Sequence, residues 1–342
     1  MYGNQKHKLT LIALTLSLLF LLLLNISFGQ IAIPIKEVFK SITGNCASKE
    51  SWEYIIFNFR LPKAITAILT GFGLSISGLL MQTLFRNPLA GPYVLGLSSG
   101  SSLGVAFVIM GSALLPSFLA EIFMSPYGII LASCLGSLAV LIAVLLVSQK
   151  IRDTMAILIV GLMFSSFTGA IVSSLTYFSS AEQLQKFTFW SMGNLGNLSW
   201  TQIFILLIAI SIGLLLSITK IKALDALLLG ESYAKSLGIN FNTTQLIIIF
   251  STSILAGSIT AFVGPIAFVG LAVPHLTKLI FQTSKHWILF WGTLLFGAIT
   301  MLLCDLISQM AGNNIVLPIN AITSIIGAPV VIWLLIRKRN YS

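Results

Sequence analysis

The side chains that most often carry chemistry are few in this sequence, and they lie far apart. The histidines and cysteines are His7, His275, His286, Cys46, Cys134 and Cys304. No two of them have the CxxC or Cys/His spacing of a metal site, and three widely separated cysteines do not predict a disulfide framework. The apolar stretches contain no paired-aspartate motif, no HExxH and no evident serine–histidine pair. We therefore expect no catalytic site, no metal site and no cofactor.

Two ionisable residues within apolar stretches suggest a different chemistry, the relay of a proton or another ion. Asp305 and His275 are the two candidates, and each lies near the end of its stretch. Ion-coupled secondary transporters use such residues within the membrane. A histidine beside a proline, as in Pro274-His275, is more often a hydrogen-bonded structural residue. A secondary transporter is therefore the alternative hypothesis.

The composition requires that most of the chain lies in a membrane. Of 342 residues, 57% are hydrophobic and only 8% are charged, and the mean hydropathy is +1.01. A soluble domain carries about 25% charged residues. This composition excludes a soluble enzyme, a secreted disulfide scaffold and a disordered protein. The net charge of +10 comes from residues scattered between apolar runs, which is typical of membrane-protein loops and not of a nucleic-acid-binding face.

The elements that must position any functional residue are apolar helices. A bilayer core of about 30 Å needs about 20 apolar residues in a helix. The hydropathy pattern predicts ten spans in a single all-α transmembrane domain covering residues 1–342, with residues 29–60 as the longest polar stretch. The predicted spans are 9–28, 62–82, 93–115, 126–148, 155–178, 200–219, 244–263, 268–282, 286–309 and 319–336. The first is expected to be retained, because no small-x-small cleavage site follows it.

The basic residues sort unevenly when the spans alternate across the membrane. Starting from a cytoplasmic N-terminus, the inner side receives Lys6, Lys8, Arg86, Lys150, Arg152, Lys220, Lys222, Lys235, Lys278, Lys285, Arg337, Lys338 and Arg339. The outer side receives Lys36, Lys40, Lys49, Arg60, Lys63 and Lys186. Because cytoplasmic loops are enriched in Lys and Arg, both termini of this multi-pass protein are predicted to be cytoplasmic.

Two segments interrupt the apolar pattern, one in each half of the chain. In the first, Gly71, Gly73 and Gly78 lie on a serine-rich helix, and the polar and proline-containing residues 87–92 follow. In the second, Gly264-Pro265 precedes a short helix that contains Pro274. Paired interruptions of this kind are typical of transporters with internal pseudo-symmetry. A tight loop between two helices is an equally good explanation of the first.

A third segment, residues 220–240, is too polar to span the membrane. Leu224, Leu227, Leu228, Ala234 and Leu237 recur at helical spacing, which predicts two short helices with one shared apolar face. Gly230 separates the helices, and Gly238 is expected to end the second. The apolar face must be covered either by the lipid surface or by a partner protein.

Together these segments resemble the permease subunits of FecCD-type ABC importers, which carry iron-siderophores, haem or vitamin B12. The resemblance covers nearly the whole chain in order. Its strings are RLPK at 60–63, GLLMQ at 78–82, RNPLA at 86–90, LG from 95, LLGExxAxxLG at 228–238, FVGLAVPH at 268–275, Asp305 and IGAP at 326–329. The sequence has no GxxxxGK[ST] loop, so any ATP must be hydrolysed by another chain.

The resemblance implies the type II ABC importer architecture in a bacterial inner membrane. It also implies a homodimer with the substrate path on its axis, two ABC ATPase subunits and an extracytoplasmic substrate-binding protein. It implies that Arg60 and Lys63 meet acidic residues of the binding protein. The segment expected to couple to the ATPase contains Leu228, Gly230, Glu231, Ala234, Leu237 and Gly238. Glu231 is also favoured at a helix start by the helix dipole alone.

Three residues depart from the family pattern. Lys63 replaces the usual arginine, which keeps the charge but loses the bidentate fork for a carboxylate. Gln309 stands where many members carry a basic residue, and Asn320 where the family favours glycine. These changes concern the strength of binding-protein docking and not the fold. The sequence leaves open which metal chelate is carried.

The hydroxyl-rich helix beginning near residue 155 is predicted to line the translocation path. Ser165, Ser166 and Thr168 lie at helical spacing within an apolar stretch, although hydroxyls in membrane helices more often bond to neighbouring backbone groups. Met81, Gln82 and Asn87 are also expected on the path. The residues expected to form the inner gate are Lys150, Arg152, Asp153 and Thr154.

Overall fold

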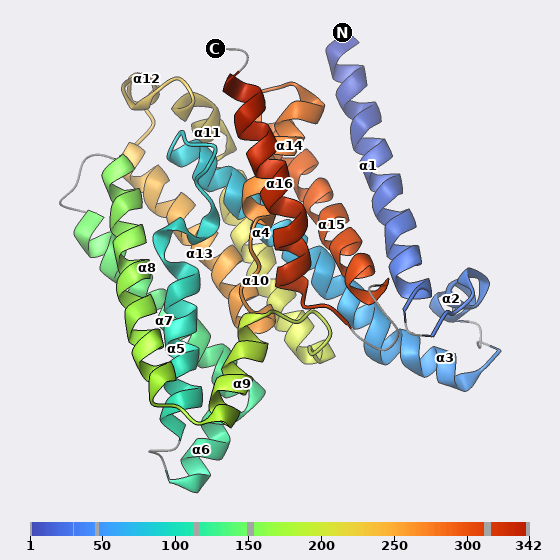
Figure 1. Cartoon of the computed structure of the whole chain (residues 1–342). Helices are drawn as coiled ribbons and strands as arrows, with labels where there is room; N and C mark the ends of the chain where they lie inside the picture. The colour runs from blue at the N-terminus through green and yellow to red at the C-terminus, as the bar shows by residue number, and fades with distance from the viewer. Residues whose placement is uncertain are drawn as a thin grey trace.

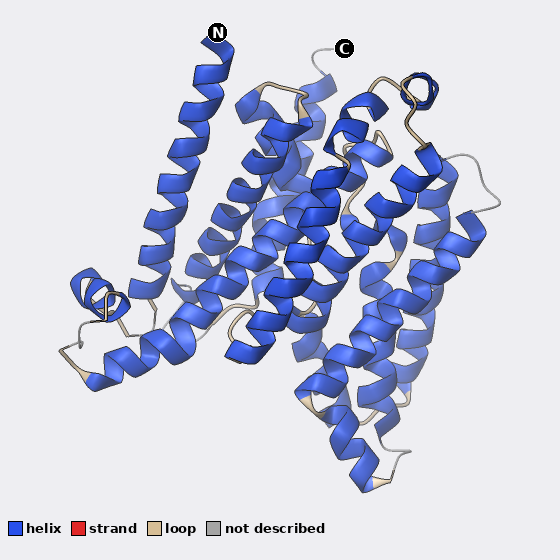
Figure 2. Cartoon of the chain, turned by 180° about the vertical axis from the view of Figure 1, so that it is seen from behind, coloured by secondary structure: helices blue, strands red, loops and turns tan. Residues whose placement is uncertain are grey.

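The structure is a computed structural model that describes residues 2–29, 31–44, 48–112, 116–148, 154–310 and 316–339. Its regular elements in these ranges are all helices, arranged as an elongated bundle (Figures 1 and 2). Ten of them correspond to the ten predicted spans. They are α1 (Tyr2–Ser27), α4 (Leu61–Leu84), α5 (Leu97–Gly111), α7 (Pro126–Ser148), α8 (Thr154–Tyr177), α10 (Trp200–Thr219), α13 (Phe241–Val263), α14 (Val269–Phe281), α15 (His286–Met310) and α16 (Ile319–Arg339).

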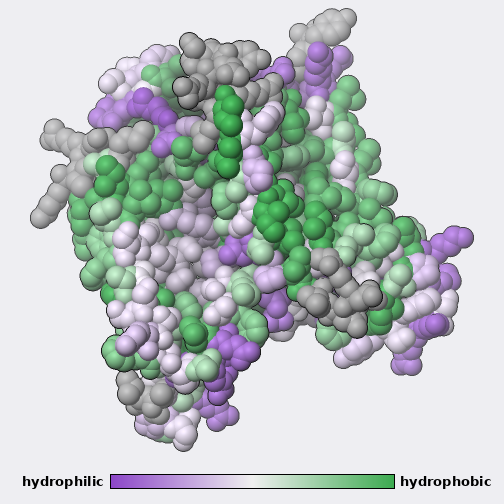
Figure 3. Space-filling model, in the orientation of Figure 1, coloured by the Kyte–Doolittle hydropathy of each residue, from purple (hydrophilic) through white to green (hydrophobic). Residues whose placement is uncertain are grey.

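Seven segments within the described ranges are long and apolar enough to cross a membrane, and α5, α14 and α16 contain shorter apolar stretches of 10–17 residues. The two shortest, α5 and α14, adjoin the interruptions that the sequence predicted. Hydrophobic side chains dominate the flank formed by α1, and most strongly hydrophilic residues lie toward the two ends of the bundle (Figure 3). This distribution fits a chain that is surrounded by lipid between its ends.

Within the described ranges, six short helices lie outside the predicted spans. They are α2 (Ile35–Ile42), α3 (Glu50–Ile55), α6 (Ser117–Met124), α9 (Ala181–Ser191), α11 (Ile221–Leu227) and α12 (Glu231–Ser236). The pair α11 and α12 was predicted. Helix α9 was not, although Ser180 and Gln183 form a capping box at its start. A π-helical turn over Ile56–Arg60 joins α3 to α4, and a 3-10 turn over Pro92–Leu95 lies between α4 and α5.

Helix α4 is the centre of the bundle and crosses it obliquely (Figure 2). In its most apolar window 83% of the residues are buried, against 11% for α1 at the periphery. It packs against α10, α13, α14 and α15. Glycines allow these contacts: a Cβ on Gly71 would lie 2.4 Å from the carbonyl oxygen of Gly297 in α15, and one on Gly78 would overlap the backbone of Gly270 in α14. The predicted close approach at these glycines is therefore present.

Both predicted interruptions are present, and each depends on left-handed backbone geometry. Gly96, with φ +78°, immediately precedes α5, and Gly264, with φ +89°, ends α13. Asn320 stabilises the second interruption, because its side-chain oxygen accepts a hydrogen bond from the backbone N–H of Ala267 at 3.1 Å. The asparagine that departs from the family pattern thus ties the start of α16 to the connection between α13 and α14.

The short helices divide between the two ends of the bundle (Figure 1). Helices α11 and α12 lie at the end that carries both chain termini, and α2, α3, α6 and α9 lie at the opposite end. We call these the terminal end and the opposite end. Lys222 and Lys235 are therefore separated from Lys36, Lys40 and Lys186 by the length of the bundle. This separation agrees with the two sides to which the sequence assigned them.

Candidate functional sites at the two ends of the bundle

The first candidate site is the helix pair α11 and α12 at the terminal end. The turn between them passes through Gly230, whose φ of +114° favours glycine. Gly238, with φ +79°, follows α12 as predicted for a residue that ends a helix. Glu231 is the first residue of α12, and its carboxylate pairs with Lys235 at 2.7 Å.

The predicted single apolar face of this pair is wrong, because the apolar residues of both helices point to two different surfaces. Leu224, Leu227 and Ala234 are buried against the rest of the chain, with exposed fractions of 1%, 3% and 0%. The outward surface consists of Leu228, Leu229, Tyr233 and Leu237, each at least 39% exposed. We call these four residues the α12 patch. Ala234 therefore packs inside the chain, and a larger side chain there would disturb the subunit itself.

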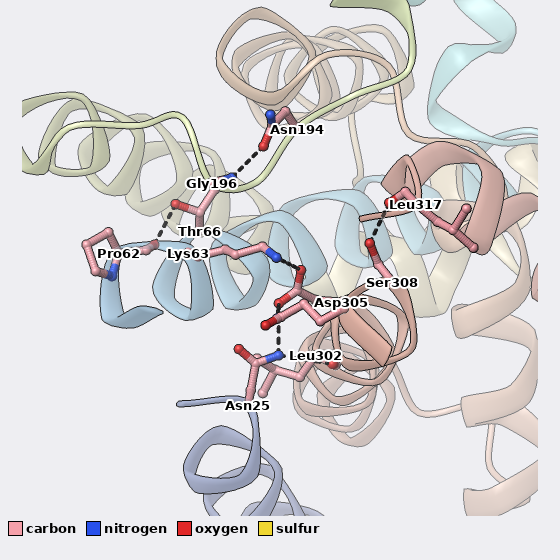
Figure 4. Close-up of polar contacts among 11 residues, drawn as sticks. Asn25, Pro62, Lys63, Thr66, Asn194, Gly196, Leu302, Asp305, Ser308 and Leu317 are labelled. Carbon is pink, nitrogen blue, oxygen red and sulfur yellow. Dashed lines mark hydrogen bonds and ion pairs between the residues drawn. The ribbon is translucent and has the colours of Figure 1, made fainter. Parts of the chain in front are cut away.

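The second candidate site is a buried polar cluster at the opposite end, centred on Asp305 of α15 (Figure 4). One carboxylate oxygen lies 2.8 Å from the ammonium of Lys63, at the start of α4. The other accepts hydrogen bonds from the amides of Asn25 in α1, at 2.9 Å, and Gln309, at 2.7 Å. Asp305 is 1% exposed, so the carboxylate on which groups from three helices converge is itself buried.

Two cavities flank this cluster, and Lys63 lines both. One, of about 310 Å³, is also lined by Asn25, Arg60 and Gln309. The other, of about 390 Å³, is also lined by Asn194 and Asn197 from the loop after α9. The side chain of Lys63 is 19% exposed. Of the three polar groups around Asp305, it therefore has both the charge and the access to meet a group entering from outside.

Arg60 is buried within the subunit, although the resemblance implied that it meets the binding protein. It is only 8% exposed, and its guanidinium donates to the carbonyl oxygens of Ile26, at 2.6 Å, and Ser27, at 2.7 Å. It also donates to the carbonyl oxygen of Ile31. A cation beside the free carbonyls at the end of α1 is favourable. Arg60 and Lys63 therefore both have partners within the subunit, which the sequence did not reveal.

The residues predicted to line the path fall into two groups. Ser166 lies on the exposed face of α8, whereas Ser165 is half-buried against α5 and bonds to Ser99, and Thr168 is buried. The hydroxyls of Ser165, Ser166 and Thr168 all bond to carbonyl oxygens one turn earlier in α8. Hydrogen bonds to neighbouring backbone groups, the alternative explanation for these hydroxyls, are therefore present.

The path residues on α4 lie in the interior of the subunit. Met81 is 0% exposed, and Gln82, at 3%, donates to the carbonyl oxygen of Leu271 at 2.9 Å. Asn87 closes the turn after α4 by accepting from the backbone N–H of Leu89. Of the expected inner gate, Lys150, Arg152 and Asp153 lie outside the described residues, and Thr154 is the first residue of α8.

The fold and the order of these elements define a class of protein, the permease subunit of an ABC transporter. A solved structure described as an inward-facing conformation of a metal-chelate type ABC transporter superposes with a TM-score of 0.83. It is 28% identical and covers 96% of this chain and 99% of its own. PsaBC from Streptococcus pneumoniae, at 18% identity and a TM-score of 0.56, shares the fold over 87% of this chain.

Within that class, the chain belongs to the FecCD transport family, whose model matches residues 17–337. It is 32% identical to the hemin transport system permease protein HmuU of Yersinia pestis over 340 residues, which are 99% of this chain and 98% of the relative. It is 31% identical to the vitamin B12 import system permease protein BtuC of Klebsiella pneumoniae over 337 residues, which are 98% and 96% of the two chains. The expected family and all-α permease architecture are confirmed.

Proposed function

We propose that this protein is the membrane-spanning subunit of an importer that moves a metal chelate of the iron-siderophore, haem or cobalamin type into the cytoplasm. The names of its relatives support this class of substrate, since they include haemin and vitamin B12 permeases matched over almost their full length. In this proposal two copies of the chain form a homodimer, and the exposed face of α8 lines the path between them. The whole chain acts as one permease domain.

The observation that carries the proposal is the α12 patch. It is an apolar surface outside the predicted spans, at the end where the positive-inside rule places the cytoplasm. Exposed apolar groups of this kind favour a protein partner. We propose that an ABC ATPase subunit covers the patch on each copy and that the energy of ATP hydrolysis enters the permease there. The terminal end, with both chain termini, is then cytoplasmic.

The opposite end would receive the substrate-binding protein. Of the two basic residues predicted for that contact, Lys63 is the more accessible, because its side chain is 19% exposed and lines both cavities beside Asp305. A carboxylate of the binding protein would have to share Lys63 with Asp305. Arg60 would contribute indirectly, by holding the end of α1 beside the same cavity.

The proposal is tested by reconstituting the permease with its ATPase and binding protein in proteoliposomes, and by supplying haem, cobalamin and ferric siderophores separately. Leu229→Glu places a charge in the α12 patch and should abolish ATPase association and uptake. Leu184→Glu is the matched control, because Leu184 is an exposed leucine on α9 at the opposite end. Association that survives Leu229→Glu would contradict the proposed ATPase contact.

The same proteoliposomes distinguish an ATP-driven importer from the alternative, an ion-coupled secondary transporter. The aspartate that suggested it, Asp305, is held in place by an ion pair with Lys63 and by hydrogen bonds from two amides, as expected for a structural residue. Uptake should therefore continue when a protonophore is added at constant ATP. Uptake that stops with the protonophore and proceeds without ATP would establish a secondary transporter instead.

A further inference from the structure

A buried histidine joins the helix pair at the terminal end to the central helices. His286 is the first residue of α15 and is 1% exposed. Its backbone N–H donates to Oδ1 of Asp225, on α11, at 2.8 Å, and its ring Nδ1 lies 2.7 Å from the same oxygen. Because a carboxylate oxygen only accepts, Nδ1 carries the proton in this contact. On the other side of the ring, Nε2 lies 2.9 Å from the hydroxyl of Thr83, in the last turn of α4.

These contacts give Asp225 two tasks at once. It satisfies one of the N–H groups that a helix leaves free at its start, and its charge lies at the favourable end of the α15 dipole. It also holds the imidazole in one orientation, so that Nε2 faces Thr83. A side chain of α11 thus caps a spanning helix that is distant in sequence. We call Asp225, His286 and Thr83 the α11 joint.

The helices on the far side of the joint form a single unit. In the middle of the bundle α4 and α15 touch through backbone at Gly71 and Gly297, and the hydroxyl of Ser75 donates to the carbonyl oxygen of Thr293 at 3.1 Å. At the opposite end the same two helices are tied by the Lys63–Asp305 ion pair. With polar contacts at both ends and no room between them, α4 and α15 can shift little against each other.

The 25 residues of α15 extend over about 37 Å. The helix therefore begins at the α11 joint and ends beside the cavities at the opposite end. A displacement of α11 reaches the opposite end only if α11 is fastened to this unit. The apolar contacts of α11 can slide, but a hydrogen-bonded carboxylate has a fixed partner and direction.

We propose that the α11 joint fastens the ATPase-facing helices to the α4–α15 unit, and that Asp225 and His286 are positioning residues for ATP-driven transport. This inference rests on the proposed function, since it presumes that an ATPase acts on the α12 patch. It adds the route by which that action reaches the substrate side.

The experiment measures substrate imported per ATP hydrolysed by the complete importer in proteoliposomes, together with the stimulation of hydrolysis by the loaded binding protein. Asp225→Ala leaves the α12 patch intact, so ATPase association and basal hydrolysis should remain. Substrate imported per ATP should fall about tenfold or more, because both hydrogen bonds from His286 to Asp225 are lost and one hydrogen bond to a charged group already corresponds to about tenfold. Asp225→Asn keeps an acceptor oxygen for both His286 donors and should restore most of the ratio.

The matched control is Lys222→Ala, which removes a charged, exposed side chain from the same helix and should leave the ratio unchanged. A wild-type ratio in both Asp225→Ala and His286→Ala would overturn the proposal. So would a loss in Asp225→Asn as large as in Asp225→Ala. If Asp225→Ala does not fold, His286→Phe decides by the same ratio, because it removes the ring Nδ1–H that bonds to Asp225 and keeps an aromatic ring in its place. Failure of the wild-type chain to associate with any ATPase would instead reject the proposed function.

Discussion

The buried ion pair between Lys63 and Asp305 gives a prediction whose size follows from burial. Replacing Lys63 by Met leaves a carboxylate that is 1% exposed with amide donors but no counter-charge. Removing one partner of a buried pair costs about 3–5 kcal/mol in the free energy of unfolding. Asp305→Asn should cost less, about 1.5–3 kcal/mol, because Lys63 is 19% exposed and its long stem can carry the ammonium toward a water-accessible cavity.

The double variant Lys63→Met/Asp305→Asn separates the pair from its surroundings. With both charges removed, no unpaired ion remains, so the double change should cost less than the sum of the single changes. An interaction energy of about 0.5–3 kcal/mol is expected for groups in direct contact. The measurement is the unfolding transition of the purified protein in mild detergent micelles titrated with SDS, followed by circular dichroism.

The control is Lys186→Met, which breaks the Lys186–Glu182 pair on α9. That pair has the same separation of 2.8 Å, but its side chains are 50% and 75% exposed. An exposed pair contributes about 0–1 kcal/mol. The reasoning is refuted if Lys186→Met costs as much as Lys63→Met, if Asp305→Asn is the more damaging single change, or if the two single losses simply add.

Two further predictions concern the opposite end and the second interruption. Hydrogen bonds from Lys40 and the Ser48 backbone lower the pKa of the Glu37 carboxyl from 4.5 to about 2. Because its folded pKa is lowered, the ionised Glu37 carboxyl contributes stability above pH 4.5, and this stability is lost as the pH falls toward 2. Proteolysis of residues 35–48 should therefore accelerate over that window in the wild type but not in Glu37→Gln. Asn320→Ala leaves the N–H of Ala267 unpaired and should lower the free energy of unfolding by about 1–3 kcal/mol, measured by the same SDS titration. An unchanged unfolding transition in Asn320→Ala would contradict the role given to this side chain.

Several features of the fold were predictable because lipid imposes them. Every backbone group within a bilayer must be satisfied internally, so long apolar runs must be helices, and hydropathy places them well. The roles of Gly71 and Gly264 were predictable because few other residues meet the same requirement. Gly71 allows a close approach between helices, and Gly264 has a positive φ. Helix α9 was missed because it is short and too polar to be read as a span, although its capping box was present in the sequence.

The candidate sites were predictable in location but not in their contacts. The polar residues 220–240 were expected to form two short helices at the cytoplasmic side, and they do form two helices. Which leucines point outward depends on how the chain turns at Gly230 and what α11 packs against. Helical spacing assigned these apolar residues to one shared face, whereas Leu224 and Ala234 pack inside the chain and Leu237 points outward.

The sequence by itself determined that this protein is a multi-pass, all-helical membrane protein of the FecCD family, because composition, hydropathy and ordered motifs are local properties of the chain. Only the tertiary structure decided which polar groups meet. Asp305 with Lys63, and Asp225 with His286, are partners brought together from distant helices, and nothing in their spacing announces the pairing. Their side chains are polar in an apolar environment, so each must find a partner, but packing alone selects which one.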